Sequence, residues 1–151
     1  MLNDGVLWME NSDGIITAVN HQTDIEKKLR IELIAKDKIF LHAALKNFET
    51  PTYKIKTKTS LIRIDELTNH KYRFALWKLG EKESSEPDII IKNGKLEFDG
   101  SGGNHVVTFV KENFTYTVYR NIIAEENTPD ITFELEKDGK IILSEDGTLI
   151  E

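Results

Sequence analysis

Cysteine is absent from the 151 residues of this chain, and its absence excludes several kinds of site. Without thiols the chain can form no disulfide, no thiolate metal site, no iron–sulfur cluster and no cysteine nucleophile. The sequence does not determine whether the protein resides in an oxidising or a reducing compartment, because a chain without cysteine is compatible with either. A folded chain of this length buries roughly two-thirds of the surface that its unfolded form exposes, so we expect a hydrophobic core to hold the fold.

Long hydrophobic runs are also missing. No apolar run comes near the roughly 20 residues that span a bilayer, and the start at residues 1–5, MLNDG, lacks the basic region of a signal peptide. We therefore expect no membrane association and a cytoplasmic location, although the removal of an export signal would leave the same pattern.

The composition, with 39% hydrophobic and 30% charged residues, is that of a soluble globular protein. The net charge is -6 and is unevenly distributed: residues 1–80 contain 13 bases and 10 acids, and residues 81–151 contain 7 bases and 16 acids. The segment 81–87 is rich in Glu and Ser and ends in Pro. We expect a single domain, with 81–87 as an acidic connector between two lobes, 1–80 and 88–151.

Glycine placement gives the strongest local signal, because six of the nine glycines follow Asp or Asn. Such pairs suit two-residue hairpin turns, whose central residues both need a positive φ. The pairs are Asp4-Gly5, Asp13-Gly14, Asn93-Gly94, Asp99-Gly100, Asp138-Gly139 and Asp146-Gly147. Alternating apolar segments flank Asn93-Gly94 and Asp138-Gly139, and two β-branched, aromatic runs are joined by residues 111–113. The sequence therefore predicts an antiparallel β meander over residues 88–151.

The first half contains one ambiguous segment, residues 23–48. A helix is favoured by the capping box Thr23 and Glu26 and by acid-to-base pairs at four-residue spacing. Two strands are favoured by apolar alternation over 29–35 and 39–45, and the β character of the rest favours strands slightly. The predicted fold is mainly β, an antiparallel sandwich or partly open barrel. One helix within 23–48 would make it α+β.

The loop from Asp99 to His105, DGSGGNH, carries the densest group of polar residues. Ser101 lacks the neighbours of a serine-protease motif, and Asp99 stands where a nucleophile elbow would have glycine. We interpret the segment as a flexible β connection, with a ligand-contacting loop as the functional alternative and a small hydrolase using Ser101 or His105 as the least favoured reading.

Other motifs predict no cofactor, no metal and no catalytic residue. The four histidines lack the short spacings of a metal site. Lys54, Lys56 and Lys58 would share one strand face, but no aromatic side chains lie between them, so we expect no nucleic-acid partner.

The leading functional hypothesis is a non-enzymatic protein that neutralises or sequesters a partner protein, in the manner of an immunity protein or inhibitor. The acidic half would attract a cationic partner, and the oligomeric state is left open. The predicted contacts are Glu81, Glu83, Glu86, Asp88, Glu125, Glu126 and Asp130. The alternative is a β domain that binds a small molecule or carbohydrate. Its predicted contacts are Trp8, Trp77, Asp99, Ser101, Asn104 and His105.

The strand at residues 114–119 and the hairpin at 137–140 give the last third of the chain a general likeness to small bacterial β proteins, including immunity proteins and lysozyme inhibitors. This likeness is carried by the strand and turn pattern alone. It transfers no functional residue to this sequence.

Overall fold

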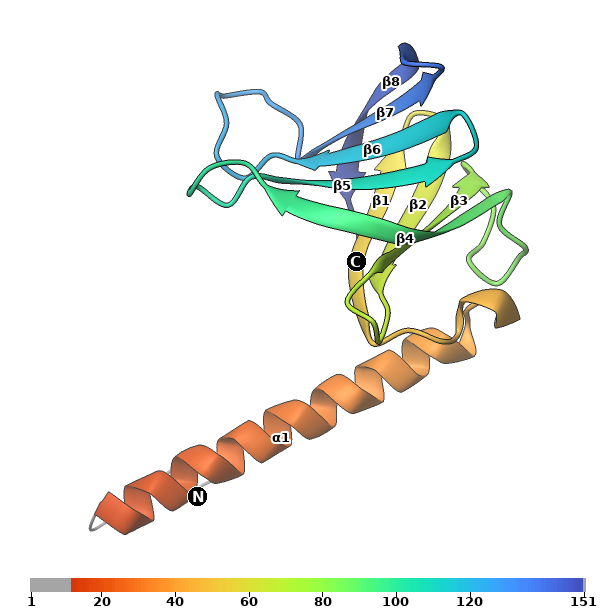
Figure 1. The fold of residues 1–151 in the computed structure, drawn as a ribbon. Helices are drawn as coiled ribbons and strands as arrows, with labels where there is room; N and C mark the ends of the chain where they lie inside the picture. The colour runs from red at the N-terminus through yellow and green to blue at the C-terminus, as the bar shows by residue number, and fades with distance from the viewer. Residues whose placement is uncertain (1–11, 151) are drawn as a thin grey trace. The chain divides into compact units, whose positions relative to one another are not determined.

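The computed structural model describes residues 12–150, with side chains from residue 23 onward. The chain divides into two compact units, residues 1–40 and residues 41–151. In the described part of the chain, the first contains one helix and the second contains a β-barrel (Figure 1).

Helix α1 (Ser12–Ile39) resolves the ambiguous segment in favour of the helical alternative as far as residue 39. Its second half is rich in Lys, Glu, Leu, Arg and Ala, which are strong helix formers. Lys36 and Lys38 lie in the last turn, where positive charge interacts favourably with the helix dipole. The slight preference for strands was wrong, and so was the start at Thr23, because Thr23 lies inside the helix.

Within the described residues, no helix combines the length and the apolar character needed to cross a membrane.

The second unit is a closed antiparallel barrel in which every strand pairs with its neighbours in the sequence, and β1 pairs with β8. A short 3-10 helix, η1 (Ala43–Leu45), precedes the barrel. The strands are β1 (Thr50–Thr57), β2 (Ser60–Glu66), β3 (Tyr72–Lys78), β4 (Ile89–Phe98), β5 (His105–Lys111), β6 (Phe114–Arg120), β7 (Ile131–Lys137) and β8 (Lys140–Leu149). The mainly β prediction and the meander are confirmed, and the barrel is closed rather than partly open.

Apolar side chains fill the barrel interior. Phe74 lies with its ring centroid 5.2 Å from Phe109, 5.3 Å from Tyr116 and 5.9 Å from Phe133. Aliphatic residues of β1, β2, β4, β5, β6 and β7 complete the core, namely Ile55, Ile62, Ile64, Ile91, Val107, Val118 and Ile131. The period-two alternation of the strands directs these residues inward.

Only some of the Asx-Gly pairs form turns. Asp138-Gly139 makes the predicted hairpin between β7 and β8, with both residues at positive φ. Asn93-Gly94 does not: it lies within β4, where the pairing with β3 shifts register. A Cβ on Gly94 would overlap the ring of Phe109, so the glycine makes room for a core side chain. Gly147 is similar, because a Cβ there would lie 2.7 Å from Ile55 Cγ2 at the β1–β8 junction.

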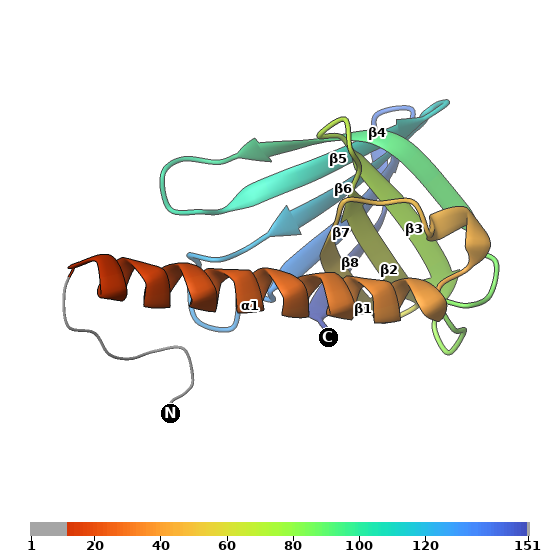
Figure 2. The ribbon, with the colours of Figure 1, turned by 90° about the horizontal axis from the view of Figure 1, so that it is seen from below.

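Residues 41–49, which we call the strap, cover the outer face of β2 and β3 (Figure 2). Leu41, Leu45 and Phe48 of the strap are buried, as are Ala75 and Trp77 on the outer face of β3. These residues form a second apolar layer outside the barrel.

The acidic segment 81–87 joins β3 to β4, which pair with each other in the same barrel. It therefore connects neighbouring strands, and the boundary between compact units lies at residues 40 and 41 instead.

Candidate functional site

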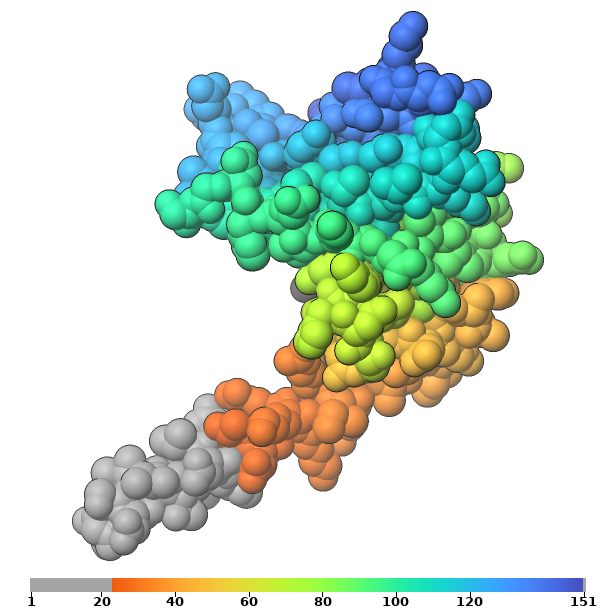
Figure 3. All heavy atoms as spheres, viewed as in Figure 1, coloured from red at the N-terminus to blue at the C-terminus, as the bar shows by residue number. Residues whose placement is uncertain are grey.

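Antiparallel alternation assigns each connection to one end of the barrel. The connections 67–71, 99–104 and 121–130 lie at one end, which we call the loop end. The connections β1–β2, β3–β4, β5–β6 and β7–β8 lie at the other, which we call the hairpin end. Figure 3 shows the loops after β4 (green) and β6 (blue) projecting on the same side of the barrel.

The seven acidic residues predicted to bind a partner do not form one surface. Those of the β3–β4 connection, Glu81, Glu83, Glu86 and Asp88, lie at the hairpin end, and Glu125, Glu126 and Asp130 lie at the loop end. The first group also has structural contacts: Glu83 accepts a hydrogen bond from Arg63 and is 3.5 Å from Lys54 Nζ. Pro87 in the same connection is buried.

Trp77 offers no platform to a ligand. It is fully buried on the outer face of β3, and its indole N–H donates to the Ser85 carbonyl at 2.9 Å. Trp8, the other predicted platform, lies outside the described residues.

The loop residues predicted to bind a small ligand lie closer together than the seven acidic residues predicted to bind a protein. A pocket of about 380 Å³ at the loop end is lined by nine residues, among them Asp99, Asn104 and His105. Ser101 does not line it.

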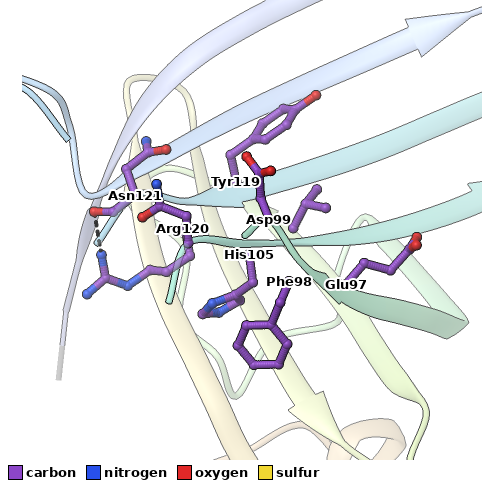
Figure 4. Close-up of a pocket in the computed structure, with 9 residues that line it drawn as sticks. Glu97, Phe98, Asp99, His105, Tyr119, Arg120 and Asn121 are labelled. Carbon is purple, nitrogen blue, oxygen red and sulfur yellow. Dashed lines mark hydrogen bonds between the residues drawn. The ribbon is translucent and has the colours of Figure 1, made fainter. Parts of the chain in front are cut away.

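Two cross-strand rows form the strand part of the pocket wall. One row consists of Phe98, His105 and Arg120, which are in register across β4, β5 and β6, and the other of Glu97, Val106 and Tyr119. Figure 4 shows the side chains of the first row on one side of the sheet and those of Tyr119 and Asp99 on the other. The alternation of the strands explains this division, because Phe98 and Asp99 are consecutive.

His105 links the loop to the barrel wall. Its Nδ1 lies 2.8 Å from the Gly103 carbonyl, which can only accept, so Nδ1 carries the proton. In the neutral ring Nε2 then accepts the hydroxyl proton of Tyr53 from β1. Both ring nitrogens are therefore engaged, and neither bonds to Ser101, as a hydrolase with these two residues would require.

Burial and nearby charge shift the pKa values of two tyrosines at the loop end. Burial raises the pKa of Tyr53 above its ordinary value, although the positive charge of Arg120 partly offsets the rise. The pKa of Tyr119 is also raised, first by burial and then by the charge of Glu134, which accepts its hydrogen bond. Both phenols remain protonated at neutral pH.

Asn104 holds the two long loops together. Its Oδ1 accepts from the backbone N–H groups of Ile122 and Ile123 at 2.7 Å each, and its Nδ2 donates to the Ile123 carbonyl at 2.8 Å. The side chain of Ile123 lies over Gly102, where a Cβ would come within 2.8 Å of its Cδ1. The loops are thus joined by polar bonds and by packing.

Ile122 and Ile123 are nevertheless exposed, at 52% and 64%, and Phe98 at the end of β4 is 69% exposed. The two isoleucines were not selected from the sequence. Their IleIle pair follows a strand and resembles core, and only the structure, in which Asn104 bonds to their backbone, shows that both side chains lie on the surface.

The sequence also gave no sign of a buried ion cluster on the outer face of β2 and β3. Asp65 accepts from Arg63 Nε at 2.8 Å and from Arg73 Nη2 at 2.7 Å, and all three side chains are at most 2% exposed. Arg73 also donates to the carbonyls of Leu45 and Asn47 in the strap. The cluster fixes the strap to the barrel.

Comparison of the chain with protein-family models, curated proteins and solved structures found no match.

Proposed function

We propose that this chain is a non-enzymatic protein-binding module that sequesters a partner protein, in the manner of an immunity protein or inhibitor, through the loop end of its barrel. The observation that carries the proposal is the exposed pair Ile122 and Ile123, held in place by Asn104. Exposed isoleucines on a fixed loop lose little conformational entropy on binding, so their burial contributes to affinity.

The negative charge around the two isoleucines indicates the surface chemistry of the partner that we propose. The loops 99–104 and 121–130 contain the acids Asp99, Glu125, Glu126 and Asp130 and no Lys or Arg. An apolar centre with a charged border is the usual arrangement of a protein interface. The partner we propose presents an apolar recess bordered by Lys and Arg, and the acids would accelerate its association at low salt.

Site-specific photo-crosslinking in cells that naturally produce the protein tests the proposal. A crosslinking amino acid at position 123 should capture one dominant protein, and the same amino acid at position 142 of the hairpin end should not. Ile142 is a matched control because it is also exposed, at 55%. Equal capture at both positions, or none at position 123, would contradict the proposal.

The captured protein then allows a quantitative comparison of two double variants. Ile122→Ser with Ile123→Ser should weaken binding at least about tenfold, because each removes a large apolar side chain from the interface. Ile141→Ser with Ile142→Ser should leave the affinity unchanged. Substitution of Glu125 and Glu126 by Gln should slow association mainly at low salt.

A further inference from the structure

Arg120 stands out at the loop end because its charge has no counter-ion among residues 23–150. The side chain is partly buried, and its Nη1 donates to the carbonyls of Asn121 at 3.0 Å and Asp130 at 3.3 Å. Among residues 23–150 no carboxylate pairs with it, and its Nε and Nη2 donors have no partner. A partly buried guanidinium without an anion is unfavourable, because carbonyls replace only part of its hydration.

Flat ring surfaces lie next to this guanidinium. The rings of Phe98 and His105 have centroids 5.3 Å apart, and Figure 4 shows both on the same side of the sheet as Arg120. His105 is only 9% exposed, and the ring of Tyr53 stacks against it with centroids 5.9 Å apart, so Phe98 provides the accessible ring surface. The exposed ring of Phe98 is available for stacking.

We propose that this pocket binds a small organic carboxylate that carries an aromatic ring. The Nε and Nη2 donors of Arg120 match the two oxygens of a carboxylate, which is the arrangement that gives bidentate hydrogen bonds. The ring of the ligand would lie against the exposed ring of Phe98. The volume of about 380 Å³ lies in the range of small-molecule sites, which are common at the mouths of β-barrels.

Two carboxylates also line the pocket, and they restrict the ligand further. Asp99 projects to the opposite side of the sheet from Arg120, and Glu97 points away from the row (Figure 4). Neither neutralises Arg120, but both disfavour a ligand with several negative charges. A monocarboxylate is therefore the class that the site fits.

This inference goes beyond the protein-binding proposal and does not depend on it. The carboxylate would contact the row of Phe98, His105 and Arg120, whereas the partner protein would contact Ile122, Ile123 and the acidic loops. Either can fail while the other holds.

Nuclear magnetic resonance titration with 3-phenylpropionate tests the inference. We expect saturable shifts of the Phe98, His105 and Arg120 signals in the millimolar range or below. Acetate, which lacks the ring, and 3-phenylpropan-1-ol, which lacks the charge, should each bind at least about tenfold more weakly. Absence of shifts at these residues, or equal binding of the alcohol, would overturn the inference.

A pair of variants tests the role of the guanidinium. Arg120→Met should weaken 3-phenylpropionate binding at least about tenfold, while Lys140→Met, which removes an exposed cation at the hairpin end, should have no effect. If Arg120→Met does not fold, Arg120→Lys serves in its place, because it keeps the charge without the paired donors. Arg120→Lys should bind 3-phenylpropionate more weakly than Lys140→Met does. Unchanged binding in the folded Arg120 variant would overturn the proposal.

Discussion

Asp65 is the carboxylate that compensates two buried guanidinium groups outside the barrel. It is 1% exposed and bonds to both Arg63 and Arg73. Removing one member of a buried ion cluster leaves the others without compensation, which is costly. The cluster therefore stabilises the fold as a unit, and Asp65, the carboxylate that both arginines share, is the most sensitive position.

We expect Asp65→Asn to lower the free energy of unfolding by about 3–5 kcal/mol, because buried Arg73 would lose its counter-ion and buried Arg63 would keep Glu83 but lose Asp65. Asp146→Asn, an exposed position in β8, is the control and should change stability by no more than about 0.5 kcal/mol. Chemical denaturation of the two variants measures the difference. Equal costs would show that the cluster contributes nothing specific.

Gly94 is important for a different reason, because it gives space to the ring of Phe109. We expect Gly94→Ala to destabilise the protein by about 1–3 kcal/mol through overpacking. In a Phe109→Leu background the same substitution should cost less, because the side chain that it meets is smaller. A double-mutant cycle in urea measures this coupling, and a coupling of zero would contradict the account.

The strap is the element that adds a second layer to the barrel. Leu45 is fully buried in it, and its backbone carbonyl accepts a hydrogen bond from Arg73. The ring of Phe48 lies 4.9 Å from the guanidinium carbon of Arg63. Apolar packing and charge thus act on the same short segment, so the strap and the ion cluster should be lost together.

We expect Leu45→Ala to cost about 2–5 kcal/mol, the usual range for truncating a buried leucine. The emission of Trp77, measured in a Trp8→Phe background, should shift to longer wavelength early in denaturant, because Trp77 is buried on the outer face of β3, to which the strap is bonded through Arg73. The exposed substitution Ala43→Ser is the control and should leave both readings unchanged. An unchanged midpoint in Leu45→Ala would show that the strap does not stabilise the barrel.

The loop end differs from the strap, because its exposed side chains do not build a core. Asn104 bonds two loops whose isoleucines remain in solvent. This arrangement contributes little to the core and presents an apolar surface, which is why we assign function to this end.

At the scale of the whole molecule, the barrel closes through a short junction. Residues Ile55–Thr57 of β1 pair with Gly147–Leu149 of β8, whereas β6 and β7 pair along their full lengths. Every other pairing joins neighbours in the sequence. The closure is therefore the main long-range step of folding.

All four tyrosines of the chain lie in the barrel and share one electrostatic property. Burial is the largest cause that raises the pKa of Tyr53, Tyr72, Tyr116 and Tyr119 above the ordinary value of 10.0. The unfolded chain thus loses these protons at lower pH than the folded barrel does. Stability is full below pH 10 and falls as the pH rises from there through the folded pKa values.

We expect the denaturant concentration at the midpoint of unfolding to decrease as the pH is raised above about 10. Tyr53→Phe should reduce the steepness of this fall, because one of the four titrating groups is removed. Unfolding curves at several alkaline pH values in the two proteins measure the effect. A midpoint that stays constant above the pKa of free tyrosine would contradict it.

The sequence alone determined the β character of residues 50–149, because alternation and β-branched residues are local properties. It also contained the helix, whose favourable residues and charge pairs lie within a few positions of one another. Two strands could be drawn through the same segment only because a short apolar run fits both periods.

The tertiary structure alone decided how residues distant in the sequence combine. Asn93-Gly94 satisfies the local requirements of a turn, yet β4 continues through it because Phe109 from β5 needs the space. Arg63, Asp65 and Arg73 alternate like solvent-facing residues and become buried only when the strap covers them. Likewise, the two acidic segments resemble each other in composition and separate because antiparallel strands direct them to opposite ends of the barrel.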